Sequence, residues 1–190
     1  AERGRAISRD RAAQDVPAGT LPGGSDTIYL TTADGRGNMV SLIQSIFHGW
    51  GSRLVPEGLG FCLQNRGQLF ALDPRHRNRL EPHKRPFHTI IPGFVTRQGR
   101  PVFAFGVMGG DFQPQGQVQV LMNLLDLGMS PQQAGDRPRA QHLHNSAPTG
   151  APRAGAGGVE LERGFADDVA PALAAMGHAV ATSSGAFGGY

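Results

Sequence analysis

Two predicted β-hairpins precede every helix that the sequence indicates. The first joins a strand at 27–33, rich in β-branched and aromatic residues, to a strand at 39–47 through the turn residues DGRGN. The second joins 88–96 to 101–107 around a Gln-Gly-Arg turn. Further short strands are predicted at 59–63 and 178–182, and helices at 115–127, after Ser130-Pro131 and at 165–176. Strands first and helices afterwards predict an α+β fold rather than a doubly wound parallel sheet.

Regular secondary structure is predicted to begin at Thr27. Residues 1–26 alternate arginine with small residues and then become rich in proline and glycine, which is typical of a tether. The chain begins with Ala1 and stops in the glycine-rich phrase AFGGY, so we expect it to be a piece of a longer protein. The sequence does not decide the cellular compartment of that protein. The single cysteine, Cys62, excludes an internal disulfide framework, and no apolar run is long enough to span a bilayer.

The basic residues predict solvated segments rather than a nucleic-acid surface. The net charge is only +3, and the arginine-rich stretches 3–11 and 73–86 lack both interleaved aromatic residues and a phosphate-cradling glycine motif. Anion binding by 73–86 stays open as the less favoured interpretation. His142 and His144 have no cysteine or carboxylate at ligand spacing, so neither a metal site nor a cofactor is expected.

Thr27 is the residue whose position suggests chemistry. A threonine hydroxyl is a poor nucleophile unless a base removes its proton. Cleavage between Asp26 and Thr27 would leave an α-amine beside that hydroxyl, and such an amine titrates near 7.7–8. Backbone amides at Gly109 and Gly110 could then hold an oxyanion. The alternative is that Thr27 simply reflects the preference of threonine for strands.

Four phrases in the sequence resemble the γ-glutamyltransferase family. They are GGSDTIYLTTADGRGNMVSLIQSIF (23–47), LGFCLQNRG (59–67), KRPFHTIIPG (84–93) and FGVMGGDFQPQGQVQ (105–119). The resemblance implies an N-terminal-nucleophile (Ntn) amidohydrolase that cuts itself into a large and a small subunit, with a four-layer α/β/β/α sandwich. Residues 1–26 would be the tail of the large subunit, and 27–190 a C-terminally truncated small subunit.

The same resemblance implies a set of catalytic residues and a partner. Thr27 falls on the nucleophile, and the bond between Asp26 and Thr27 on the self-cleavage site. Ser45 matches a second hydroxyl that supports the nucleophile, and Gly109 with Gly110 matches the oxyanion-hole glycines. The partner would be the large subunit of the same precursor, which carries a substrate-gripping arginine. Family members are often periplasmic or secreted, and a cytoplasmic location is the alternative for this protein.

The resemblance implies that Asn65, Arg66, His88 and Thr89 bind substrate. Asn65 and Arg66 lie in the family's substrate-facing stretch, and His88-Thr89 stand where the family has a serine pair for the substrate carboxylate. Leu69 replaces an aspartate and Phe47 a polar residue, both of which would read the glutamyl amine, and the loop at 71–86 is short. Because leucine cannot hydrogen-bond an ammonium, that group would go unpaired at a cost of about 1–3 kcal/mol. The departures resemble the acylase-like branch, which includes cephalosporin acylases.

Three hypotheses about function follow from the sequence. The leading one is transfer or hydrolysis of a γ-glutamyl or other acyl group through an acyl-threonine intermediate on Thr27. The second keeps this chemistry and changes the substrate to bulkier acyl amides, as in a cephalosporin-acylase-like amidase. The third is a non-catalytic fragment or pseudoenzyme that binds anions through the loop at 73–86.

Overall fold

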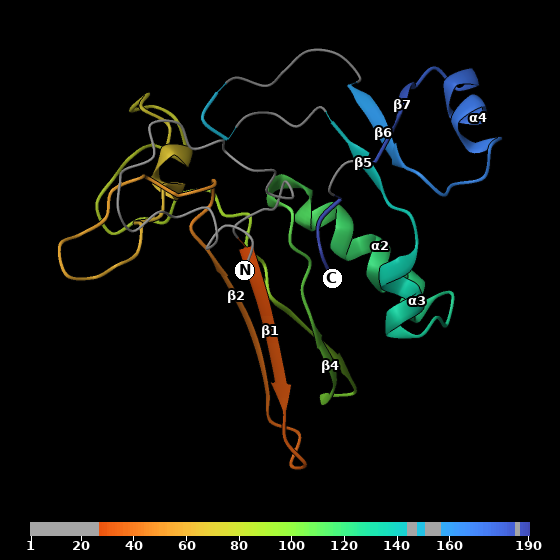
Figure 1. The fold of residues 1–190 in the computed structure, drawn as a ribbon, viewed down its shortest axis with the longest axis horizontal. Coiled ribbons are helices and arrows are strands. Elements are labelled where there is room, and N and C mark those ends of the chain that lie inside the picture. Colours follow the sequence, from red (N-terminus) through yellow and green to blue (C-terminus); the bar gives the residue numbers. More distant parts are fainter. Residues whose placement is uncertain (1–26, 144–147, 151–156, 185–186) are drawn as a thin grey trace, which may run out of the picture.

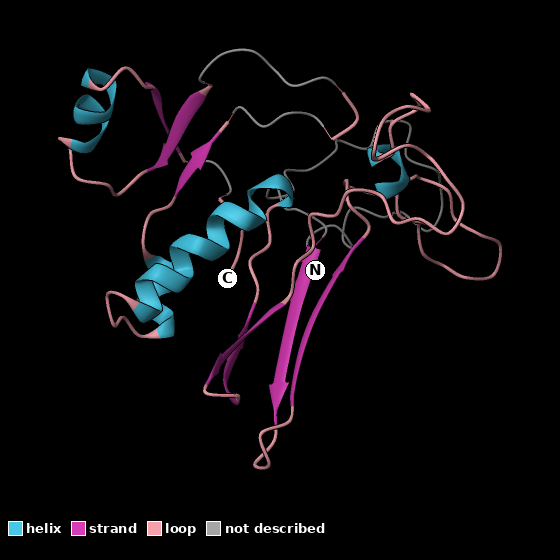
Figure 2. Cartoon of the chain, turned by 180° about the vertical axis from the view of Figure 1, so that it is seen from behind, coloured by secondary structure: helices cyan, strands magenta, loops and turns pink. Residues whose placement is uncertain are grey.

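The computed structural model describes residues 27–143, 148–150, 157–184 and 187–190. The proposed tether at 1–26, Asp26 included, and His144 lie outside the described residues. Two hairpins, β1 (Thr27–Ala33) with β2 (Met39–Ser45) and β3 (Gly93–Arg97) with β4 (Arg100–Phe105), point downwards side by side in Figure 1. The loops between β2 and β3 lie on the left, helix α2 (Gln113–Leu125) crosses the middle, and a small sheet with helix α4 (Val169–Ala175) lies on the upper right; Figure 2 shows the same arrangement from behind. Helices and strands both occur, so the α+β class predicted from the sequence is confirmed.

The first hairpin forms where the sequence predicts it. Strand β1 (Thr27–Ala33) pairs antiparallel with β2 (Met39–Ser45), and the register sets Thr27 opposite Ser45 at the open end. The turn is held by the Asp34 carboxylate, which accepts hydrogen bonds from the backbone amides of Arg36 and Asn38, both at 2.9 Å. These bonds to the charged form lower the pKa of Asp34. The hairpin register therefore brings two hydroxyl side chains together.

The second hairpin packs beside the first. Strand β3 (Gly93–Arg97) pairs with β4 (Arg100–Phe105), with a register shift between Val95 and Thr96. Both strands are shorter than the predicted 88–96 and 101–107, since residues 88–92 and 106–107 are irregular. The hydroxyl of Ser41 on β2 donates to the carbonyl of Phe105 at 3.3 Å. After Phe105 the chain leaves the hairpin and leads into the long helix at 113–125.

Helix α2 (Gln113–Leu125) carries the small core of the molecule. It follows the 3₁₀ turn η2 (Gly110–Phe112), and the buried cluster joins residues from β4's exit, the turn, the helix and the chain end: Val107, Phe112, Val120 and Phe187. Gly116 lets the helix approach this cluster, because a Cβ there would lie 2.6 Å from the Phe112 ring. This core therefore fixes the position of the segment at 108–112.

Helix α3 (Pro131–Asp136) begins as predicted. The Ser130 side chain accepts from the backbone amide of Gln133 at 3.3 Å, while the Gln133 side chain accepts from the Ser130 amide at 3.0 Å. This capping box satisfies two amides that would otherwise be left without partners. Pro131 occupies the first turn, where its missing N–H costs nothing.

A three-stranded sheet closes the fold and was only partly predicted. Strand β6 (Gly158–Glu162) lies in the middle, antiparallel to β5 (Ala140–His142) and parallel to β7 (Ala179–Ser183). Sequence patterns predicted β7 and the preceding helix α4 (Val169–Ala175), which is shorter than the predicted 165–176. They missed β5 and β6, which are only three and five residues long.

One predicted strand is wrong. Residues 59–63 form turns instead, within a long loop between β2 and the 3₁₀ turn η1 (Arg66–Leu69). The backbone bonds that would extend a strand go to the loop itself, since Leu63 donates to Leu54 and accepts from Ser52. Three large residues of this loop have positive φ without being glycine, namely Phe47, Trp50 and Arg53. Such conformations are costly for bulky side chains and persist only where the surroundings impose them.

Apolar side chains lie uncovered on one face of the first hairpin. Ile28 and Leu30 on β1 share this face with Val40 and Leu42 on β2, and each is about half or more exposed. The loop after β2 adds Trp50 and Leu54, which are 69% and 65% exposed. Exposed apolar patches of this kind usually mark a contact with another protein segment or subunit. Within the described residues, no helix is long and apolar enough to cross a bilayer.

Candidate active site

Thr27 and Ser45 form the centre of the candidate site. The hydroxyl of Thr27 donates to the hydroxyl of Ser45 at 3.0 Å, and the Ser45 oxygen also accepts from the backbone amide of Phe47 at 2.9 Å. Thr27 is only 6% exposed although it opens a strand at the hairpin mouth. The geometry therefore links the Thr27 hydroxyl to a second hydroxyl, whereas the resemblance implied a bond from Ser45 to the amine of residue 27.

The glycine pair lies across a pocket from Thr27. Gly109 has φ 131° and Gly110 φ 58°, both in the region that favours glycine. Among the described residues, neither amide N–H of this pair donates a hydrogen bond. Two backbone donors on a turn that lines the same pocket as the Thr27 hydroxyl could stabilise a developing oxyanion.

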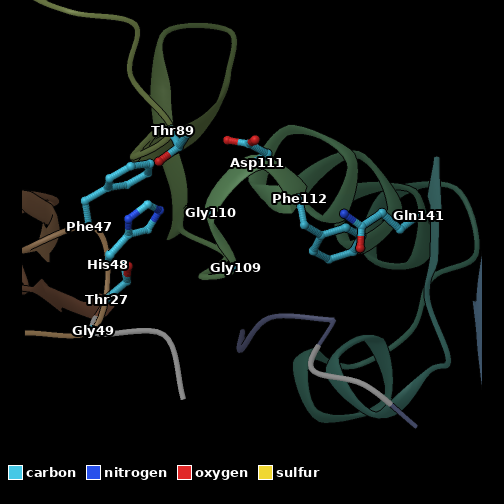
Figure 3. Close-up of a pocket in the computed structure, with 10 residues that line it drawn as sticks. All are labelled: Thr27, Phe47, His48, Gly49, Thr89, Gly109, Gly110, Asp111, Phe112 and Gln141. Atoms are coloured by element: carbon cyan, nitrogen blue, oxygen red, sulfur yellow. The ribbon is translucent and has the colours of Figure 1, made fainter. Parts of the chain in front are cut away.

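The pocket between these groups has a volume of about 370 Å³. Its walls come from the hairpin mouth, the loop after β2, the turn η2 and strand β5: Thr27, Phe47, His48, Gly49, Thr89, Gly109, Gly110, Asp111, Phe112 and Gln141. Figure 3 shows Phe47, His48 and Thr27 on one side and Asp111 and Phe112 on the other, with the glycine pair between them. Segments far apart in sequence therefore converge on Thr27.

Arg66 lies behind the pocket wall and is 98% shielded from solvent, with 2% exposure. Its Nη1 donates to the Thr89 hydroxyl at 2.7 Å, and its guanidinium carbon lies 4.7 Å from the centre of the Phe47 ring. The Nε and Nη2 atoms have no hydrogen-bond partner among the described residues. Burial lowers the pKa of Arg66, and the negative charge of Asp111 partly offsets this effect. The side chain remains charged because arginine starts from so high a pKa.

His48 is a pocket residue that the sequence patterns did not identify. Its ring stacks on Phe47 with centroids 4.3 Å apart, and its backbone amide donates to the side-chain oxygen of Asn65 at 3.1 Å. The side chains of Asn65 and Gln68 also reach the ring nitrogen Nδ1, at 3.3 and 3.1 Å. A lone histidine in a loop gives no sequence signal, since its place here depends on the positive φ of Phe47.

The expected substrate-binding residues occupy three different settings. Thr89 lines the pocket beside Thr27, whereas Asn65 and Arg66 lie behind its wall and hold His48 and Thr89 in place. His88 faces a neighbouring cavity of about 330 Å³, whose lining also includes Thr89. The Nδ1–H of His88 donates to the carbonyl of Pro86 at 2.9 Å. The structure therefore places Thr89 in the same pocket as Thr27 and sets the other three outside it.

The chain end supports the glycine pair from behind. The amide of Met108 donates to the carbonyl of Gly189 at 2.8 Å, and the Phe187 and Phe112 rings meet edge to face at 6.0 Å. Gly188 has φ 76°, and any Cβ there would collide with the Met108 carbonyl. The position of Gly109 is thus set jointly by the core and by residues 187–190.

The loop at 71–86 pairs three of its five basic side chains with its two acidic ones and keeps a net positive charge. Arg75 pairs with Asp73 at 3.3 Å, and Arg79 and Lys84 both pair with Glu81, at 2.9 and 3.5 Å. These partners lower the pKa of both Asp73 and Glu81. The segment is an exposed loop, as predicted. Among the described residues, no three histidine, cysteine or acidic side chains are grouped as metal ligands would be.

Comparisons with known proteins agree with this geometry. The family model for γ-glutamyltranspeptidase matches residues 1–190. The chain is 47% identical over 124 residues to the glutathione hydrolase-like YwrD proenzyme of Bacillus subtilis, a match covering 65% of this chain and 24% of that protein. It is 41% identical over 123 residues to the oxamate amidohydrolase proenzyme of Klebsiella pneumoniae, covering 65% of this chain and 23% of that protein. The chain thus spans about a quarter of the length of these curated relatives.

A solved structure extends the agreement to the fold. The crystal structure of cephalosporin acylase from Bacillus halodurans superposes with a TM-score of 0.73 at 49% identity, covering 84% of this chain and 28% of that one. A match over the whole chain, together with relatives of this similarity, is more than shared architecture would produce. The chain belongs to the γ-glutamyltranspeptidase family.

Proposed function

We propose that this chain provides the catalytic portion of a self-processing Ntn amidohydrolase in which Thr27 is the nucleophile. The observation that carries the proposal is that Thr27 and the Gly109-Gly110 pair line one pocket, while Ser45 accepts a hydrogen bond from the Thr27 hydroxyl. Proenzyme relatives support self-cleavage, which would occur between Asp26 and Thr27. The catalytic residues would then be Thr27, Ser45, Gly109 and Gly110.

The reaction follows from the arrangement once the Thr27 amine is free. That amine takes the proton of the Thr27 hydroxyl, and Oγ1 attacks the carbonyl carbon of an amide. The amides of Gly109 and Gly110 hold the oxyanion until the bond to nitrogen breaks. The leaving amine departs with the transferred proton, and water or another amine releases the acyl group from Thr27. Ser45 fixes the direction of the attacking oxygen.

The exposed apolar surfaces support a partner in the same precursor. The uncovered face that includes Leu30 and Leu42 needs a second layer, which a large subunit would provide in a four-layer sandwich. Residues 1–26 would then be the end of that large subunit, and 27–190 the small-subunit part. The partner's contribution to substrate binding would complete the pocket wall opposite Thr89.

A second candidate keeps the chemistry and changes the acyl group. Leu69 and Phe47 stand where the resemblance implies readers of a glutamyl amine, which favours an acylase-like specificity over a strict γ-glutamyl one. Similarity to both a glutathione hydrolase-like proenzyme and a cephalosporin acylase supports either specificity. Comparable rates on γ-glutamyl-p-nitroanilide and on acyl amides without the α-amine would favour the acylase type.

The decisive experiment is the intact mass of the purified full-length gene product. Two chains, the smaller beginning at Thr27, would support both self-processing and the nucleophile. The Thr27→Ala variant should remain a single uncut chain without turnover. Normal cutting of that variant would contradict the proposal, and an uncut wild-type protein would favour the non-catalytic alternative.

A further inference from the structure

Two glutamines of helix α2 bind the edge of strand β5 that faces away from β6. The Gln119 side chain accepts from the backbone amide of Ala140 and donates to its carbonyl, both at 2.8 Å. One turn earlier, the Gln115 side chain accepts from the amide of His142 at 2.7 Å and donates to its carbonyl at 3.2 Å. Positions four apart on a helix and two apart on a strand are both separated by roughly 6–7 Å, so the two spacings match. We call these bonds the glutamine clamp.

The glutamine clamp holds Gln141 at the pocket. The other edge of β5 pairs with β6, where Gln141 lies opposite Glu160, so both edges of the strand are bonded. Gln141 lines the same pocket as Thr27. Figure 3 shows its side chain on the side of Asp111 and Phe112, across the glycine pair from Thr27. Among the described residues its amide group has no hydrogen-bond partner, so the strand presents a donor and an acceptor that a ligand can use.

The side-chain acceptors of the pocket indicate which part of an amide substrate lies on this side. The nitrogen of a scissile amide carries N–H donors, and the departing amine keeps them. The Thr89 oxygen already accepts from Arg66, and Nδ1 of the His48 ring faces two amide nitrogens. By contrast, the oxygens of Asp111 and Gln141 receive no hydrogen bond from the described residues. The amine half of the substrate therefore fits against Gln141 and Asp111.

We propose that Gln141 binds the amine that leaves the acyl group or attacks it, and that Gln115 and Gln119 are positioning residues. Oε1 of Gln141 accepts from the N–H of that amine, and the exposed carboxylate of Asp111 attracts its ammonium form. In transfer, the nitrogen of the neutral amine bonds to the acyl carbon, and the bond from that carbon to Thr27 Oγ1 breaks. The α-amine of Thr27 passes the proton of the attacking amine to Oγ1. The ligand class is aliphatic primary amines.

An amine competes with bulk water for the acyl group on Thr27. It therefore gains a share of that group only where the pocket binds and orients it. Gln141 consequently sets how the acyl-enzyme divides between transfer and hydrolysis. This inference rests on the proposed role of Thr27, and it concerns the partner that receives the acyl group.

The first test measures this division on the processed full-length protein. An acyl p-nitroanilide that the protein turns over is supplied together with propylamine. Release of p-nitroaniline reports acylation, and chromatography gives the ratio of propylamide to free acid. Gln141→Leu should lower that ratio about fivefold, the size expected for the loss of one hydrogen bond. Gln141→Glu keeps the acceptor oxygen and should hold the ratio at or above the wild-type value. An unchanged ratio in Gln141→Leu would overturn the assignment.

The same ratio tests the glutamine clamp, because the ratio of products does not depend on how much of the protein is folded and active. Gln115→Met and Gln119→Met each remove both bonds to β5 and should lower the ratio about threefold. Gln119→Glu keeps the acceptor for the Ala140 amide and should give an intermediate ratio. Gln132→Met is the control, because that glutamine lies on α3 and bonds the side chain of Asp136. A wild-type ratio in both clamp methionine variants would refute the positioning role.

Ligand binding separates this inference from the proposed function. In the full-length Thr27→Ala protein, saturation-transfer NMR should detect bound propylamine and should not detect butan-1-ol, its uncharged counterpart. Adding Gln141→Leu to that background should weaken the propylamine signal. Propylamine binding without any turnover by the wild type would sink the nucleophile and keep the amine site. Turnover with neither propylamine binding nor propylamide formation would do the reverse. The same measurement serves for any Gln115 or Gln119 variant that fails to process.

Discussion

Two regions of the molecule each bury an arginine, and they treat it differently. In the three-stranded sheet, Arg139 is 8% exposed and lies 3.7 Å from the carboxylate of Glu162, which also accepts from the Arg139 backbone amide. In the pocket wall, Arg66 is 2% exposed and has a hydroxyl and an aromatic ring as its neighbours. The sheet arginine has a counter-ion within the fold, and the pocket arginine has none among the described residues.

The difference indicates what each charge is for. A buried pair whose partners come from adjacent strands fixes the fold and leaves little charge for a ligand. A buried cation held only by neutral groups keeps its field, at a cost in stability that function would have to justify. The four predictions below change one side of this comparison at a time.

The largest expected effect comes from making the sheet arginine resemble the pocket arginine. Glu162→Ala would leave the Arg139 charge buried without its partner, which should lower the free energy of unfolding by about 3 kcal/mol. Thermal unfolding of the full-length protein measures this change. Glu81→Ala is the control, because that carboxylate pairs with Arg79 and Lys84 at the surface and its loss should barely matter. Equal midpoints for both variants would show that Arg139 does not need its counter-ion.

The next effect should appear in rate rather than in stability. Gly109 has φ 131°, and a Cβ there would lie 3.1 Å from the Cα of Gly188, so Gly109→Ala should displace one oxyanion donor. Loss of one such donor costs about 10²-fold in kcat. The matched control is Gly99→Ala in the β3–β4 turn, where φ is 75° and a Cβ meets nothing within 4 Å.

The control separates strain from chemistry. Both glycines lie in the left-handed region, so both variants carry backbone strain, but only Gly109 borders the pocket. Steady-state kinetics on the processed proteins should show the loss of kcat in Gly109→Ala alone. A similar loss in Gly99→Ala would mean that strain, and not the oxyanion donor, lowers the rate.

Local signals in the sequence were enough to predict the elements that position Thr27. The β-branched run at 27–33 with its DGRGN turn set the first hairpin, and Ser130 with Pro131 set the start of α3. The same kind of signal failed at 59–63, where apolar residues spaced as in a strand lie in turns. It also missed β5 and β6, since three- and five-residue strands are defined by their neighbours rather than by their own composition.

Only the site residues that lie in phrases resembling the family could be predicted from the sequence. Thr27, Ser45 and the glycine pair were expected from matched phrases; in the structure Ser45 contacts Thr27, and the glycine pair lines the same pocket as Thr27, while their catalytic roles stay predictions. His48 was missed because its position depends on the unusual backbone of Phe47 and on Asn65, seventeen residues later. Arg66 was expected to face substrate, and its burial behind Thr89 could not be read from spacing. Tertiary packing decides which side chain faces the pocket and which lies behind it.

The third prediction sharpens the pocket side of the comparison. Asp111 lines the pocket and is the acidic group that acts electrostatically on Arg66, so Asp111→Asn should make the wall more positive. The KM for γ-glutamyl-p-nitroanilide, which carries a carboxylate, should fall about threefold, a modest change because Asp111 is exposed to solvent. Asp126→Asn at the end of α2 is the control and should leave KM unchanged. A higher KM in Asp111→Asn would instead indicate that Asp111 holds a positive group of the substrate.

The smallest effect concerns Tyr190, in the chain-end segment that supports the glycine pair. Burial, and secondarily the neighbouring Tyr29, raises the pKa of Tyr190 above its ordinary value of 10.0. In the folded state the phenol therefore keeps its proton at pH values where the unfolded chain has lost it. This contribution to stability is complete below pH 10 and disappears as pH rises through the raised pKa.

Tyr190→Phe removes that dependence, since phenylalanine cannot ionise in either state. Denaturant unfolding between pH 9 and pH 11.5 should show a steeper loss of stability in the wild type than in the variant. Every other residue is the same in the two proteins, so the difference between the two curves reports on Tyr190. Parallel curves would mean that the phenol of Tyr190 is as well solvated in the folded protein as in the unfolded chain, and that residues 187–190 rest on the core more loosely than the Phe187–Phe112 contact implies.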